Sequence, residues 1–207
     1  MKIKSASFIK SATQKNDYPK DNIKEIAFCG RSNVGKSSLL NALTNNKKLA
    51  KVSGTPGKTR LINFFDINNG SFRIVDLPGY GFAKVGKKES DSWKKMIEAY
   101  LNNRENLISL IVLLDIRHKP TPQDIDMIDF VNYNRKGGII VLTKIDKLSK
   151  LEQKKNIEMI SKFLYKNLAG KYIENDIQLL PVSAAKKLGL IELLSDIEMK
   201  LKDERKN

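Results

Sequence analysis

The stretch GRSNVGKS, residues Gly30–Ser37, decides the fold, because it matches the pattern G-x-x-x-x-G-K-[ST]. Its two glycines permit backbone angles and a close approach that a Cβ atom would block. The N–H groups of such a loop, and of the helix that it opens, face phosphate oxygens. A glycine-rich turn that binds nothing is the competing interpretation. The context argues against it, since the loop follows a predicted buried strand, Glu25–Cys29, and opens a predicted helix, Lys36–Asn45.

Short β-rich runs alternate with longer helical patterns along the chain, which predicts an α/β fold with helices on both faces of a mostly parallel sheet. The six expected strands are Glu25–Cys29, Leu61–Asn68, Ser71–Asp76, Leu107–Asp115, Gly138–Thr143 and Ile177–Val182. The expected helices are Lys36–Asn45, Ser92–Arg104, Pro122–Asn134, Glu152–Leu168 and Leu188–Leu201. The turn Asn68-Asn69-Gly70 predicts a hairpin and hence one antiparallel strand. Ser5–Lys10 is a further candidate, as an edge strand outside this count.

The composition indicates a cytoplasmic protein with a basic surface. Thirty-eight Lys and Arg against 23 Asp and Glu give a net charge of +15. Two interpretations of this charge stay open: a surface that binds a polyanion such as nucleic acid, and lysines that are merely solvated on helix faces. The longest apolar runs, such as Leu107–Leu114, are too short to span a membrane, and Cys29 has no second cysteine to pair with. We find no interdomain linker and expect one domain over residues 1–207, with an N-terminal extension of about residues 1–22.

Two further segments suggest a metal site and a switch. Asp76-Leu77-Pro78-Gly79 ends a predicted strand, where the carboxylate can hold Mg²⁺ through water and the Gly79 N–H can meet a γ-phosphate. Ser37 offers a hydroxyl to the same ion. Thr55 and Thr59, between the first helix and the hairpin, are both candidates to complete the Mg²⁺ shell. We favour Thr59, because it lies next to the strand, whereas Thr55 is explained as a turn residue before a proline.

A base-binding element is predicted where two later strands end. Thr143-Lys144-Ile145-Asp146 places a carboxylate that can accept hydrogen bonds from the N1–H and amino group of guanine. The Lys144 stem can lie over the base, and backbone N–H groups of Val182-Ser183-Ala184 can reach the guanine O6. Taken alone, the motif is better explained by Asp146 as a helix N-cap before Leu148. In order with the other motifs, the guanine interpretation is preferred.

Several other residues invite a functional role. His118 is the only histidine, and a structural or partner-facing role is favoured over that of a catalytic base. We expect Arg31 to be solvated and Trp93 to pack in or near the core. Tyr80 and Phe82 lie in a glycine-rich loop, which predicts a partner-contact surface, and the adjacent lysine-rich run 84–88 is either solvated or faces RNA.

With these elements in order, the chain resembles the translation-factor-like GTPases, and more closely the EngB (YsxC or YihA) family of ribosome-assembly GTPases. The closer resemblance is carried by GRSNVGKSSLLNAL (Gly30–Leu43), TPGKTRLINFF (Thr55–Phe65), DLPGYGFAKV (Asp76–Val85), DIRHKPTPQD (Asp115–Asp124), TKID (Thr143–Asp146) and PVSA (Pro181–Ala184). It implies a Ras-like P-loop GTPase domain that hydrolyses GTP to GDP and phosphate with Mg²⁺. The implied role is assembly of the large ribosomal subunit through its rRNA, with a link to cell division and septation. We expect the protein to act as a monomer.

Carried over residue by residue, the resemblance implies a complete nucleotide site. The residues are Gly30, Arg31, Ser32, Asn33, Val34, Gly35, Lys36 and Ser37 in the phosphate loop, Gly57, Lys58, Thr59, Arg60 and Leu61 in the first switch, Asp76, Leu77, Pro78 and Gly79, then Thr143, Lys144, Ile145 and Asp146, and finally Val182, Ser183 and Ala184. Lys36, Thr59 and Gly79 are the expected catalytic residues, and Ser37 and Thr59 the expected metal ligands.

Two departures from the general GTPase pattern affect the prediction. Thr143 stands where many GTPases have asparagine, so the tether to the phosphate loop is expected to be weaker. Tyr80 stands where other GTPases have a glutamine that orients water, which predicts slow hydrolysis without a stimulating partner. A resemblance to potassium-activated GTPases suggests Asn33 as a K⁺ ligand.

Two alternative functions remain at this point. One is a non-enzymatic scaffold in cell division that keeps GTP as a structural ligand, and slow hydrolysis is compatible with it. The other is an ATP-dependent kinase, against which Asp146 argues, because adenine would leave its carboxylate poorly paired.

Overall fold

A computed structural model describes residues 1–50, 61–81, 87–133, 138–168 and 179–203. The strands are β1 (Ala6–Ala12), β2 (Glu25–Gly30), β3 (Ile62–Ile67), β4 (Phe72–Asp76), β5 (Leu107–Asp115), β6 (Ile139–Thr143) and β7 (Leu179–Pro181). The helices are α1 (Lys36–Leu43), α2 (Lys87–Asn103), α3 (Pro122–Tyr133), α4 (Lys150–Leu168) and α5 (Leu190–Lys202). Short 3-10 turns cover Lys15–Asp17 and Ile145–Lys147.

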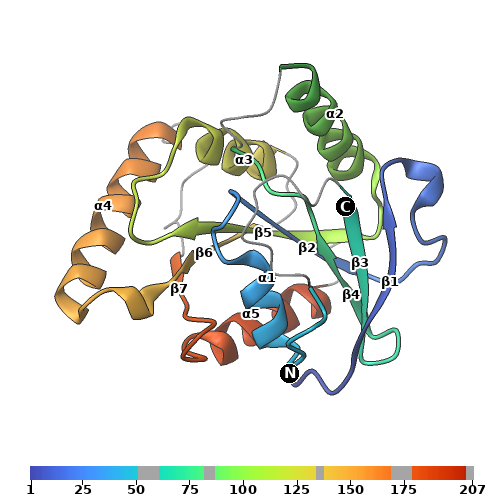
Figure 1. The fold of residues 1–207 in the computed structure, drawn as a ribbon, viewed down its shortest axis with the longest axis horizontal. Helices are drawn as coiled ribbons and strands as arrows, with labels where there is room; N and C mark the ends of the chain where they lie inside the picture. The colour runs from blue at the N-terminus through green and yellow to red at the C-terminus, as the bar shows by residue number, and fades with distance from the viewer. Residues whose placement is uncertain (51–60, 82–86, 134–137, 169–178, 204–207) are drawn as a thin grey trace.

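The strands form one seven-stranded sheet in the order β1-β3-β4-β2-β5-β6-β7 (Figure 1). Strand β3 pairs antiparallel with both β1 and β4, and the other neighbouring pairs are parallel. The predicted α/β sheet with one antiparallel strand is therefore confirmed, and β1 is the extra edge strand that the sequence offered as a candidate. Asn68 and Asn69 both have positive φ in the β3–β4 turn, as a tight hairpin requires.

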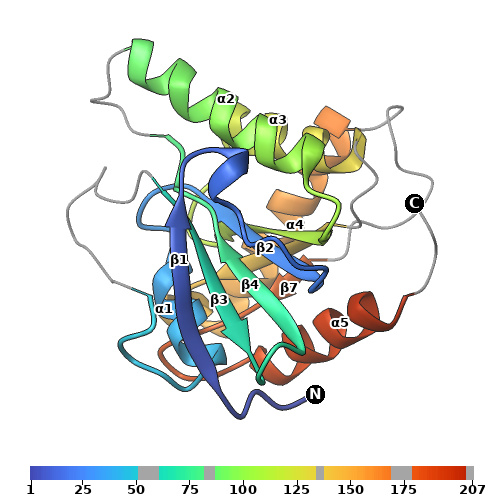
Figure 2. The ribbon, with the colours of Figure 1, turned by 90° about the vertical axis from the view of Figure 1, so that its right-hand side faces the viewer.

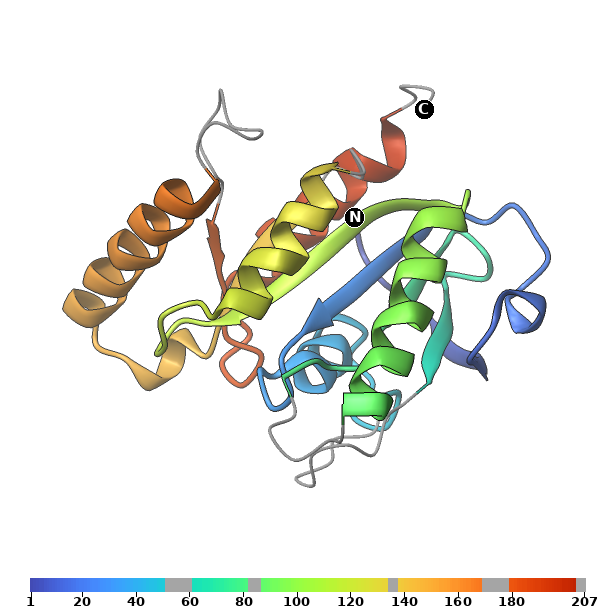
Figure 3. The same cartoon turned by 90° about the horizontal axis from the view of Figure 1, so that it is seen from above.

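Helices cover both faces of the sheet (Figures 1 and 2). Helices α2, α3 and α4 lie in a row across one face (Figure 3), and α1 and α5 cover the other. Each face has its own buried apolar cluster. Tyr100, Ile128 and Leu164 belong to the first cluster, and Leu39 and Ile197 to the second. Because both faces are covered, the central strands are apolar throughout rather than alternating.

A buried ionic network ties the N-terminal segment to the start of the sheet. Glu25, the first residue of β2, is fully buried. Its carboxylate accepts hydrogen bonds from Arg104 at 2.5 and 2.9 Å and from the Tyr100 hydroxyl at 2.9 Å. Arg73 of β4 lies 4.0 Å away and donates to Asp21. The paired buried charges thus hold the end of α2 and the N-terminal segment against the sheet.

Candidate nucleotide-binding site

The loop 30–37 connects β2 to α1 as predicted, with α1 beginning at Lys36. Gly35 has φ of 107°, a conformation that favours glycine. At Gly30, an added Cβ would lie 2.9 Å from Val34 Cγ1 and 3.0 Å from the Leu113 carbonyl oxygen. No side chain of the described residues caps the N-terminus of α1. Its first N–H groups are therefore available to an external anion.

Lys36 and Asp76 form an ion pair in which both side chains are largely buried. Asp76 is the last residue of β4, so the parallel pairing of β2 with β4 brings its carboxylate beside the phosphate loop. Ser37 follows Lys36 and is half-buried in the first turn of α1. One lysine, one hydroxyl and one carboxylate thus gather at the start of this helix.

The segment after β4 runs alongside the phosphate loop and bonds to its backbone. The Tyr80 N–H donates to the Gly30 carbonyl at 3.3 Å, and the Ser32 N–H donates to the Tyr80 carbonyl at 3.0 Å. The Leu77 N–H likewise donates to the Phe28 carbonyl at 3.0 Å. Gly79 is therefore held next to the phosphate loop, as the predicted γ-phosphate contact requires.

Tyr80 is buried, which contradicts the expectation of a partner-contact surface. The side chain is only 4% exposed, and its hydroxyl donates to Asp124 Oδ1 of α3 at 2.8 Å. Burial, together with the nearby Asp124 carboxylate, raises the pKa of Tyr80 well above its ordinary value. Asp124 Oδ2 accepts bonds from the N–H and hydroxyl of Thr121, both at 2.7 Å. Tyr80 therefore connects the segment after β4 to the start of α3.

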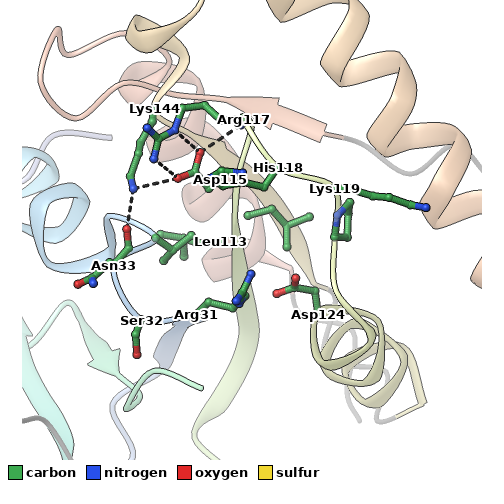
Figure 4. Close-up of a pocket in the computed structure, with 13 residues that line it drawn as sticks. Arg31, Ser32, Asn33, Leu113, Asp115, Arg117, His118, Lys119, Asp124 and Lys144 are labelled. Atoms are coloured by element: carbon green, nitrogen blue, oxygen red, sulfur yellow. Dashed lines mark hydrogen bonds and ion pairs between the residues drawn. The ribbon is translucent and has the colours of Figure 1, made fainter. Parts of the chain in front are cut away.

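Thr143 and Lys144, at the end of β6, both bond to the phosphate loop. The buried Thr143 hydroxyl donates to the Val34 carbonyl at 2.6 Å, so a threonine here does tether the loop. Lys144 has a positive φ of 64°, and its ammonium donates to the Asn33 carbonyl at 2.6 Å (Figure 4). These two bonds fix the predicted base element directly against the predicted phosphate element.

Asp146 and Ser183 come together from two different loops. The Ser183 hydroxyl donates to Asp146 Oδ1 at 2.6 Å, and this bond lowers the pKa of Asp146. The Ile145 N–H donates to the Val182 carbonyl at 3.3 Å, and the Val182 N–H to the Leu142 carbonyl at 2.7 Å. The two predicted base-binding segments therefore form one unit, with an ionised carboxylate held in place by the buried Ser183.

Asp115, which sequence reasoning did not select as a site residue, is bonded to this unit. Its carboxylate accepts hydrogen bonds from Arg117 Nε at 2.9 Å and Nη2 at 2.7 Å, and lies 2.9 Å from the Lys144 ammonium. Burial opposes ionisation, but the bonds from Arg117 and Lys144 prevail and lower its pKa to about 2. The sequence signal was that two predicted strands end at Asp115 and Thr143. In the structure these residues are paired, so β5 and β6 end side by side.

A pocket of about 240 Å³ opens between the phosphate loop and the segment that follows β5 (Figure 4). Its lining includes Arg31, Asn33, Asp115, His118 and Lys144. Arg31 is half-buried, and its Nε is enclosed without a hydrogen-bond partner among the described residues. The expectation of a solvated Arg31 is therefore wrong for this part of the side chain. His118 is exposed, as a partner-facing residue would be.

Some predicted positions lie outside the described residues. These are Thr55, Gly57, Lys58, Thr59, Arg60, Phe82 and the run 84–86, and the side chain of Trp93 is also not described. Leu61, the last residue assigned to the first switch, is described and is 39% exposed. The choice between Thr55 and Thr59 remains a prediction.

Comparisons with known proteins agree with this geometry. A family model described as "50S ribosome-binding GTPase" matches residues 25–144. The "Probable GTP-binding protein EngB" of Clostridium kluyveri is 54% identical over 198 residues, which cover 96% of each chain. The chain belongs to the EngB family of GTP-binding proteins. Because it belongs to this family and has the fold described above, the chain is a P-loop GTPase.

Solved structures of related GTPases share the fold. The crystal structure of a probable GTP-binding protein EngB aligns with a TM-score of 0.68 and 26% identity, covering 86% of this chain and 98% of that one. Era, solved with MgGDPNP and nucleotides 1506–1542 of 16S ribosomal RNA, aligns with a TM-score of 0.63 and 26% identity over 86% of this chain and 56% of Era. No helix in the described part of the chain is long and apolar enough to cross a membrane.

Proposed function

We propose that this EngB-family GTPase is a GTP-dependent switch in the assembly of the large ribosomal subunit, acting through ribosomal RNA. The observation that carries the proposal is the match of residues 25–144 to a family described as 50S ribosome-binding GTPases. The net charge of +15 supports it, because a basic surface attracts the phosphate backbone of RNA. Era, which shares the fold, was solved with nucleotides 1506–1542 of 16S ribosomal RNA.

In this proposal, the phosphates and the metal bind at the start of α1. The loop 30–37 cradles the phosphates, and Lys36 exchanges its ion pair with Asp76 for the β and γ phosphates. Ser37 and Thr59 would supply hydroxyl oxygens to Mg²⁺, and the Asp76 carboxylate would hold the ion through water. These are the oxygen donors that Mg²⁺ prefers. Bound Mg²⁺ would neutralise charge that develops on the phosphates. The donor chemistry of these residues therefore fits the ion.

The base is proposed to bind between the loops that contain Asp146 and Ser183. The ionised carboxylate accepts hydrogen bonds from guanine N1–H and its amino group. The Lys144 stem covers one face of the base, while its ammonium stays on the phosphate loop. Backbone N–H groups of residues 182–184 would receive the guanine O6. Adenine lacks the matching donor pair, which favours guanine over adenine.

Hydrolysis is proposed to be slow in the isolated protein. Lys36, Thr59 and the Gly79 N–H would stabilise charge on the γ-phosphate. Tyr80 follows Gly79, and its hydroxyl is engaged by Asp124 inside the protein. A buried phenol in this position does not offer the amide that orients water in other GTPases. A partner on the ribosome would then supply the missing group or reposition the segment.

Potassium dependence is a further part of the proposal. The Asn33 side chain is exposed on the phosphate loop, and the residue has a positive φ of 62°. An amide oxygen there would contribute one ligand for K⁺ beside the phosphates. Hydrolysis measured in K⁺ and in Na⁺ buffers tests this, and equal rates would rule it out.

The link to cell division and septation is proposed from the family resemblance, as a consequence of the role in ribosome assembly. Depleting the protein should reduce mature large subunits before septa become abnormal. Sucrose-gradient profiles and septum counts from the same time course provide the measurement. Septation defects that precede any change in the subunit profile would favour the scaffold alternative.

Co-sedimentation with purified large-subunit precursors tests the main proposal. Binding should be stronger with a non-hydrolysable GTP analogue than with GDP, and it should weaken as salt rises, because phosphate contacts release counterions. Lys36→Ala should lose the nucleotide dependence. Association that is the same in all nucleotide states, or none at all, would contradict a GTP-dependent switch on this particle.

A further inference from the structure

We propose that Asp115 is a positioning residue for the guanine nucleotide, because its carboxylate fixes the Lys144 side chain between β5 and the phosphate loop. The inference rests on the base-binding role proposed above for Lys144 and Asp146. It extends that role to a residue on a different strand, in a segment that the nucleotide motifs do not include.

The contacts of Lys144 form a continuous bridge. Its ammonium lies 2.9 Å from Asp115 Oδ2 and donates to the Asn33 carbonyl at 2.6 Å (Figure 4). The side chain of Asp115 is 13% exposed and that of Lys144 is 27% exposed. The pair is therefore better shielded from solvent than an ordinary surface ion pair, and its attraction is less screened.

The contacts of the Lys144 side chain stabilise an unusual backbone conformation at the same residue. Lys144 adopts φ of 64° and ψ of 31°, a left-handed conformation that side chains other than glycine seldom take. The 3-10 turn Ile145–Lys147, which contains Asp146, begins immediately after it. Anchoring the ammonium at two points offsets the cost of that conformation. The turn is then held in the position that presents Asp146 to the base.

Arg117 keeps the Asp115 carboxylate ionised and oriented. Its guanidinium donates to both oxygens, and its backbone N–H donates to Oδ1 at 3.1 Å. With the pKa near 2, Asp115 remains charged at every pH where the protein would work. Asp115 Oδ2 faces Lys144 and orients the lysine. Asp115 Oδ1 accepts the Arg117 backbone N–H and so shapes the turn after β5.

A purely structural role for Asp115 is the competing explanation, since the bond to the Arg117 N–H would stabilise the loop by itself. The two explanations differ in what happens when Lys144 loses its charge. If Asp115 acts through the lysine, its removal has no effect once the ammonium is gone. If Asp115 only shapes the loop, its removal has the same effect in either background.

The experiment is a double-mutant cycle on nucleotide affinity with the full chain. Dissociation constants for fluorescent GDP and for a non-hydrolysable GTP analogue are measured for Asp115→Asn, for Lys144→Met, which keeps the stem without the charge, and for the double variant. Asp126→Asn, an exposed carboxylate on α3, is the charge-matched control. Asp115→Ser retains an acceptor for the Arg117 N–H and separates the loop role from the lysine role.

We expect Asp115→Asn and Asp115→Ser each to weaken both nucleotides about tenfold, as loss of a hydrogen bond to a charged group predicts, mostly through faster dissociation. The double variant should bind no more weakly than Lys144→Met, and Asp126→Asn should match the unmodified protein. Equal affinity of Asp115→Asn and the unmodified protein, or additive losses in the double variant, would overturn the inference. If Lys144→Met and Asp146→Asn both leave affinity unchanged, the proposed base site itself fails.

Discussion

Replacing Tyr80 by phenylalanine removes one oxygen atom from the interior and should destabilise the fold measurably. The hydroxyl donates to Asp124 Oδ1 at 2.8 Å, and both side chains are buried. A hydrogen bond to a charged group contributes about 1.5–3 kcal/mol, and the acceptor that stays behind is cut off from water. For a chain of this size each kcal/mol shifts the melting temperature by about 2–4 °C. Tyr80→Phe should therefore melt about 3–12 °C lower.

Differential scanning calorimetry of the nucleotide-free protein measures this shift. Tyr165→Phe is the matched control, because Tyr165 lies on α4 with 62% of its surface exposed. It undergoes the same chemical change without burial and should melt within about 1 °C of the unmodified protein. Urea unfolding at constant pH gives the free energy independently. If Tyr80→Phe and Tyr165→Phe have the same melting temperature, the Tyr80–Asp124 hydrogen bond contributes nothing to stability. The bond would then not hold the segment after β4 against α3.

Four further changes test other parts of the structure. Lys36→Ala should abolish tight nucleotide binding, since it removes the ammonium that pairs with Asp76 and is proposed to bind the phosphates. Unchanged affinity for fluorescent GDP would refute the phosphate-loop assignment. Asp146→Asn should relax guanine specificity, which competition between guanine and xanthine nucleotides would reveal. Glu25→Gln leaves buried arginine charge without its partner and should cost about 3 kcal/mol in urea unfolding, whereas a loss below about 1 kcal/mol would show that the network is dispensable. Asp115 has a folded pKa lowered to about 2, so its contribution is complete above about pH 4 and is lost as the pH falls towards 2, and the stability difference from Asp115→Asn should shrink over that window.

The fold was predictable because the hydrophobic pattern and the turn residues agree. The strand predicted at Leu107–Asp115 begins and ends at those residues, since a run that is apolar except for Ser109 is bounded by polar residues. The helix predicted to begin at Ser92 instead begins at Lys87. Its first turn is a polar stretch, KKESD, that carries no apolar periodicity, so no pattern in the sequence marks its start.

The proximity of the candidate site residues was predictable only where a local motif marks them. Loop 30–37 and the segments around Asp76, Asp146 and Ser183 each follow a strand, and the parallel sheet brings their ends together. Tyr80 was misjudged because its burial depends on Asp124, 44 residues later in the chain. An aromatic residue between glycines has no local pattern that indicates a buried acceptor. Distant partners of this kind are visible only once the helices are placed.

The phosphate loop is held from both sides by groups that belong to other elements, and this arrangement suggests how a nucleotide signal would travel. On one side, Thr143 and Lys144 bond to the carbonyls of Val34 and Asn33. On the other, Ser32 donates its N–H to Tyr80, which is bonded in turn to α3. A γ-phosphate that draws the Ser32 N–H towards itself must break or lengthen the bond to Tyr80, because one N–H cannot satisfy two acceptors fully. The movement of Tyr80 would then reach α3 through Asp124, whereas the base element would stay fixed. GTP and GDP should accordingly differ in the exchange protection of the α3 amides but not in that of β6, which hydrogen–deuterium exchange can measure.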